Sequence, residues 1–101
     1  MLDDIKAVLP TKPYPDVPNL LKDIERALRQ KYPAAWNPDE RDFPALIVYP
    51  DPGDRTKALA EFRPEDRGTS YLILIDGSQV VSVMPKDESK AYWVGEEQPS
   101  I

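Results

Sequence analysis

Twelve prolines interrupt this chain of 101 residues and restrict which segments can become helix or strand. Proline fixes φ and lacks an amide proton, so it is disfavoured inside helices and central strands. The prolines are spread along the chain rather than gathered in one tract, and hydrophobic residues make up 41% of the total. The prolines therefore separate the helices and strands of a folded protein. The length predicts a single domain over residues 1–101.

The first third of the chain predicts two helices joined by an extended strap. Apolar residues recur at helical spacing over residues 2–9, which indicates a short helix. This helix and a proline-rich strap together fill residues 1–16. A longer helix is expected over about 17–32, with Asp16 as N-cap, Pro18 in the first turn and one apolar face.

The rest of the chain predicts an antiparallel meander of three to five strands. Residues 43–49 form a short apolar run bounded by prolines, which is typical of a buried strand. Residues 71–75 and 79–84 flank an Asp-Gly pair, which favours a hairpin with a type I′ turn. Segment 55–63 fits a helix or a strand, with a slight preference for strand. The arm 71–75 is apolar on both faces, so it is expected near the centre of the sheet.

Three further segments complete the expected layout. Residues 33–42 are predicted to form a loop, residues 91–94 a last short strand, and residues 95–101 a frayed tail. The predicted fold class is α+β, in which the helix at about 17–32 packs across one face of the antiparallel meander.

The chemistry open to this chain is limited, because it contains no histidine and no cysteine. The usual nitrogen and sulfur ligands of zinc, haem and iron–sulfur clusters and the best thiolate nucleophile are therefore missing, and carboxylates, lysines, tyrosines and hydroxyls remain. The four glycines stand too far apart for a phosphate-binding loop, and the acidic clusters do not follow calcium-loop spacing. We expect no cofactor, no metal and no catalytic site; an enzyme of this composition would have to rely on paired carboxylates.

The distribution of charge favours a protein partner. The net charge is -5; residues 33–54 carry five acids and one base, and residues 76–101 carry five acids and two bases. An acidic surface disfavours nucleic acid and is suited to a basic protein. The longest apolar run, residues 45–49, is far too short to span a membrane, and no signal peptide is apparent at the N-terminus. A cytoplasmic protein is expected.

Aromatic and acidic residues in predicted loops and near the C-terminus are the candidate contacts. Exposed aromatic residues often anchor protein interfaces. On a strand, Tyr92 and Trp93 would point to opposite faces, so one of them is expected to be exposed or covered by a partner. The predicted partner-binding residues are Trp36, Asp39, Glu40, Asp42, Tyr92 and Trp93.

The hairpin arms are a second candidate surface, because they carry few of the charges that normally protect sheet edges. If one arm lies at an edge, strand addition or a homodimer joined through that edge is favoured. The leading hypothesis is a non-enzymatic interaction module of the acidic inhibitor, immunity or adaptor type. The alternatives are an assembly subunit of a virion or another multimeric complex, and a carboxylate-based enzyme or small-ligand binder.

Overall fold

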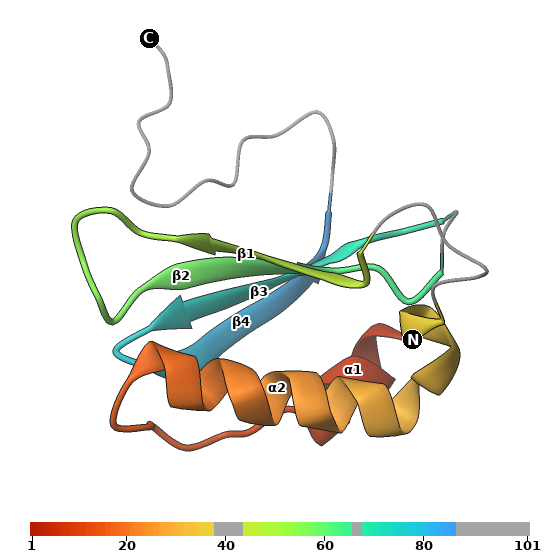
Figure 1. Cartoon of the computed structure of the whole chain (residues 1–101), viewed down its shortest axis with the longest axis horizontal. Coiled ribbons are helices and arrows are strands. Elements are labelled where there is room, and N and C mark those ends of the chain that lie inside the picture. Colours follow the sequence, from red (N-terminus) through yellow and green to blue (C-terminus); the bar gives the residue numbers. More distant parts are fainter. Residues whose placement is uncertain (38–43, 66–67, 87–101) are drawn as a thin grey trace, which may run out of the picture.

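Two helices cover one face of a four-stranded antiparallel sheet (Figure 1). The computed structural model describes residues 1–37, 44–65 and 68–86. The α+β architecture and the meander predicted from the sequence are confirmed. The predicted strand at 91–94 and the predicted tail at 95–101 lie outside the described residues.

Both predicted helices are present. Helix α1 spans Leu2–Val8 and helix α2 spans Val17–Lys31. The carboxylate of Asp16 accepts a hydrogen bond of 2.8 Å from the Asn19 N–H, which satisfies a donor left free at the start of α2. Pro33–Trp36 forms a short 3-10 helix, η1, where the sequence predicts a loop. Proline suits this position, because its fixed φ is already helical and the first turn needs no amide donor.

The strands lie in the sheet in chain order, each antiparallel to the next. The ambiguous segment 55–63 contains a strand, and the apolar arm of the hairpin lies between two neighbours, as predicted. The first strand begins later than the predicted start at Phe43, which lies outside the described residues. The strands are β1 (Leu46–Pro50), β2 (Ala58–Phe62), β3 (Tyr71–Asp76) and β4 (Gln79–Pro85).

The hairpin turn lies one residue later than the Asp-Gly prediction. Gly77 and Ser78 have φ values of 65° and 57°, whereas Asp76 still belongs to β3. Two tertiary hydrogen bonds hold Ser78 in this left-handed conformation. Its N–H donates to the Thr56 carbonyl at 2.9 Å, and its carbonyl accepts from the Tyr14 N–H at 3.0 Å. The turn is therefore anchored to both the β1–β2 connection and the strap.

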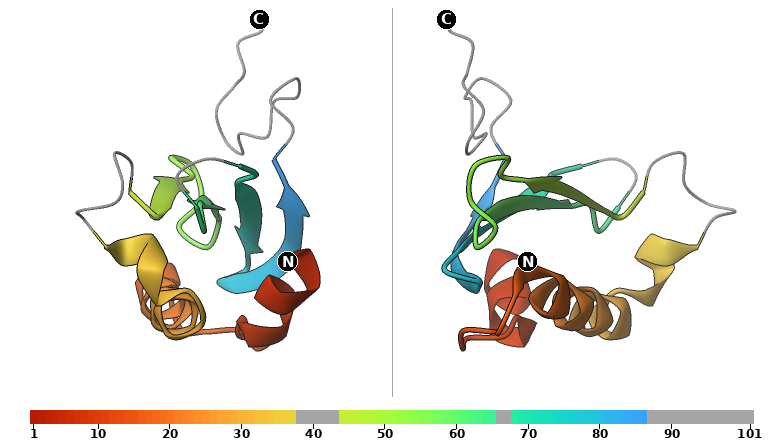
Figure 2. Two further views of the ribbon diagram at one scale, coloured as in Figure 1. Left: turned by 90° about the vertical axis from the view of Figure 1, so that its right-hand side faces the viewer. Right: turned by 60° about the vertical axis from the view of Figure 1, so that its left-hand side comes forward.

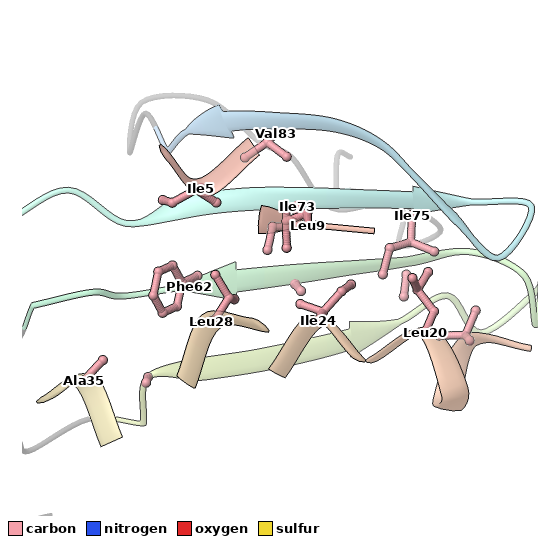
Figure 3. Packing of buried hydrophobic residues seen from close by; sticks show 14 residues of the cluster. Ile5, Leu9, Leu20, Ile24, Leu28, Ala35, Phe62, Ile73, Ile75 and Val83 are labelled. Carbon is pink, nitrogen blue, oxygen red and sulfur yellow. The ribbon is translucent and has the colours of Figure 1, made fainter. Parts of the chain in front are cut away.

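The core lies between the helices and the sheet. Figure 3 shows α2 presenting Leu20, Ile24 and Leu28 to the strands, at the spacing of one helical face. Figure 2 shows α1 beside β4, so α1 covers the end of the sheet that α2 does not reach. Each fully buried side chain of this size contributes about 1.5–3 kcal/mol of transfer free energy. None of the helices within the described ranges combines the length and apolar character needed to cross a bilayer.

Candidate protein-interaction surface

Among the described residues, strand β4 forms one edge of the sheet, and its seven positions carry no charged residue. The Lys86 N–H donates to the Ser70 carbonyl at 2.9 Å, so this residue directs its backbone groups toward the β3 side. Because the direction of backbone groups alternates along a strand, the N–H and C=O of Val83 point away from β3. Pro85 points the same way and needs no donor partner there.

A groove of about 320 Å³ runs beside this edge. One wall is β4, and the other is the end of α1 with the start of the strap; Figure 2 shows the two elements side by side. Among the described residues of the lining, Lys6 is the only charged one, and the others are apolar or bear a hydroxyl group. The groove is lined by Lys6, Leu9, Pro10, Thr11, Val80, Val81, Ser82 and Val83.

Val81 is the exposed apolar residue of this groove. Its exposed fraction is 57%, and among the described residues only Met1 shares this combination of size and exposure. The register of β3 and β4 shifts between Leu74 and Ile75, which leaves Val81 as the extra residue of a bulge. The bulge separates Val81 from the regular ladder and leaves it on the surface.

The opposite edge, β1, is protected in a way that β4 is not. Strand β1 has only five residues, Pro50 ends it, and the exposed Pro44 precedes it. Short strands and prolines are common devices that prevent edge-to-edge pairing. Of the two edges of this sheet, β4 is therefore the one suited to accept another strand.

The sheet face away from the helices holds a buried carboxylate. Glu61 is 3% exposed, between Ile47 and Leu72 in the register. Its oxygens lie 3.4 Å from the Lys86 Nζ and 3.5 Å from an Arg63 nitrogen. Two cations therefore compensate the negative charge of Glu61. This compensation accounts for the buried carboxylate by a structural role.

The strap forms a separate concavity of about 370 Å³, whose charged lining residues are Lys12, Lys22, Arg26 and the acid Asp23. The Tyr14 hydroxyl donates a hydrogen bond of 2.5 Å to Asp23, which also binds Arg26. The hydrogen bond from Tyr14 lowers the pKa of Asp23, and the same bond raises the pKa of Tyr14. The cluster thus fixes the strap against α2.

Trp36 is the only predicted contact residue within the described ranges. It is partly buried, and its ring stacks on Phe62 with centroids 5.9 Å apart. The Arg29 guanidinium lies 5.1 Å from the Trp36 ring centroid. Trp36 therefore helps to cover the core, and its role in partner binding stays a prediction. The other predicted contacts lie outside the described residues: Asp39, Glu40, Asp42, Tyr92 and Trp93.

Sequence reasoning found the uncharged strand but missed the other wall of the groove. The sequence at Leu9 and Pro10 predicts only the end of a helix and does not indicate a binding surface. The groove exists only because α1 packs beside β4, which is a long-range contact. Within residues 1–37, 44–65 and 68–86, no three acidic side chains come together as a metal site.

No protein-family model, curated protein or solved structure matches this chain. The function is therefore inferred from β4 and its groove.

Proposed function

We propose that this protein is a non-enzymatic interaction module, of the adaptor or inhibitor type, which binds by adding an extended segment to β4. The observation that carries the proposal is the uncharged edge strand beside a groove with an exposed Val81. A cytoplasmic location and a contribution from the acidic and aromatic residues named above remain predictions from the sequence.

Strand addition fits this edge for two physical reasons. An incoming strand would supply partners for the outward N–H and C=O of Val83, and such main-chain bonds provide affinity with little dependence on sequence. Side chains of an added strand alternate between its two faces, so every second one would enter the groove. Specificity would then come from the side chains that pack against Leu9, Pro10 and Val81.

The remaining chemistry of the groove supports binding rather than catalysis. Within the part of the chain that the structure describes, Lys6 is its single charged residue, and no acidic residue belongs to the lining. General acid–base catalysis needs a positioned proton donor and acceptor. This groove offers mainly aliphatic side chains and backbone, which suit an extended polypeptide.

An assembly subunit is the second candidate, and the same strand favours it. Because β4 is uncharged, two copies of it can approach without repulsion between strand charges. The two functions use one surface and differ only in the identity of the added strand.

A random ten-residue peptide library displayed on phage provides the test. Enriched peptides would be synthesised with one backbone N-methyl group at a time, and their affinity for the full chain measured by calorimetry. Strand addition predicts a period of two, because only alternate amides of the peptide face β4. N-methylation should abolish binding at every second position and have little effect between them.

The matched protein variants are Val81→Lys and Gln30→Lys. Both add one positive charge at an exposed residue, but Gln30 lies on α2, away from the groove. Val81→Lys should abolish peptide binding, whereas Gln30→Lys should not change it. The absence of any enriched peptide, or equal binding to both variants, would overturn the proposal.

A further inference from the structure

We infer that the strand added to β4 is β4 of a second copy of this chain, related to the first by a two-fold axis. This inference rests on the proposed function, since it names the partner of the same edge. The two four-stranded sheets would then join into one continuous antiparallel sheet across the dimer.

The backbone of β4 is complementary to itself. In an antiparallel pair with two-fold symmetry, each outward N–H meets an outward C=O of the other strand, and the contact is the same from both sides. Val83 presents one such donor and one such acceptor. Pro85 presents only an acceptor, because proline has no N–H. It lies at the end of the strand, where a missing donor disturbs the hydrogen bonds between the two copies least.

The charges of the molecule also favour this contact. The chain carries -5 overall, so most contacts between two copies bring like charges together. Strand β4 carries none, and of the described residues that line the groove beside it only Lys6 is charged. The Lys6 side chain is exposed, so its ammonium can stay in water while its stem covers the added strand.

The groove receives the side chains of the second copy. Val81 is 57% exposed in one copy, and pairing would place it against the aliphatic surface of the other. Leu9 and Pro10 form the wall that alternate side chains of the added strand would contact. Each copy covers Val81 of the other, so the symmetric pair removes two exposed valine side chains from water.

The assembly closes at two copies. A chain with two open edges would continue to add strands and form a fibre. Here β1 is short, ends at Pro50 and follows Pro44, so it does not offer a second edge. An interface made mainly of one strand pair is small, so we expect a dissociation constant in the micromolar range.

The absence of native cysteine allows a direct test on the full chain. The variant Val81→Cys would be treated with a bis-maleimide whose spacer is about 14 Å long, at several protein concentrations, with Gln30→Cys as the matched control. When Val83 pairs with its own copy, residue 81 lies two residues from the axis in each strand, so its two copies are about 14 Å apart; Gln30 lies on α2. We expect a covalent dimer for Val81→Cys, none for Gln30→Cys, and dependence on concentration.

Sedimentation equilibrium of the cysteine-free chain gives the second measurement. Val81→Lys should raise the dimer dissociation constant by about tenfold or more, since each copy would place a charged side chain where the valine packs against the aliphatic surface of the other. Gln30→Lys should leave it unchanged. A dimer equally stable in both variants, or growth beyond two copies, would overturn the inference.

A chain that stays monomeric up to about 1 mM would also overturn it, since that concentration detects even weak association. This result would leave the proposed function standing, provided that selected peptides still show the period of two in N-methylation. If those peptides fail while the dimer forms through residue 81, the inference stands and the edge accepts only its own copy.

Discussion

Truncation of Phe62 tests the core on which every other feature depends. Phe62 is fully buried on β2, where its ring packs between Tyr32, at 5.4 Å between centroids, and Trp36, at 5.9 Å. Replacing a buried phenylalanine by alanine costs about 3–5 kcal/mol of unfolding free energy. Aromatic pairs add about 0.5–1.5 kcal/mol beyond area burial, so we expect Phe62→Ala to fall in the upper half of that range.

This loss is large against the whole stability of the domain. A chain of this length has an unfolding free energy of about 5–15 kcal/mol. At about 4–8 °C per kcal/mol, the melting temperature should fall by roughly 15–40 °C. Phe62→Leu keeps most of the volume and should cost less than about 1.5 kcal/mol.

Urea denaturation followed by far-ultraviolet circular dichroism measures both variants of Phe62. The signal comes from the backbone, so the change in aromatic residues does not disturb it. A loss for Phe62→Ala no larger than for Phe62→Leu would refute the packing of η1 over β2, because a large cavity would then have cost nothing.

Three further predictions concern polar groups. Glu61→Leu should lower the urea midpoint, because removing one partner of a buried ion pair leaves the charge of Lys86 uncompensated beside the sheet; an unchanged or higher midpoint would mean that water compensates this cation without Glu61. Hydrogen bonds from Tyr14 and Thr56 lower the pKa values of Asp23 and Asp54 below 3.8, so stability present at neutral pH should be lost as pH falls below about 4, which melting curves from pH 7 to 2 would measure. Tyr14→Phe should raise the pKa of Asp23 toward its ordinary value in an NMR titration and weaken this acid dependence; an unchanged titration would contradict the assigned hydrogen bond.

Local sequence signals were sufficient for most of the fold. The apolar face of α2, its cap at Asp16 and the apolar arm that became β3 each depend on residues within one element. The strand in segment 55–63 could not be assigned from local signals alone, because its conformation depends on pairing with neighbouring strands. Its helix propensity was outweighed because β2 pairs on both sides, with β1 and with β3.

Features that depend on contacts distant in sequence were not predicted. The hairpin turn moved to Gly77–Ser78 because the strap and the β1–β2 connection both bond to Ser78. The burial of Glu61 could not be read from its own strand, since the compensating Lys86 lies 25 residues away. The groove beside β4 likewise depends on the position of α1.

The lack of charges on β4 supports the proposed function, because charged residues and prolines that could protect an edge are frequent elsewhere in this chain. Charged residues form 31% of the sequence, and prolines flank β1, yet neither occurs within β4 before Pro85. Core packing requires Val83 to be apolar, but it makes no such demand on Val81, which is largely exposed. A lysine there would block edge pairing at little cost to the core. The absence of lysine at this position is what the proposed strand addition to β4 requires.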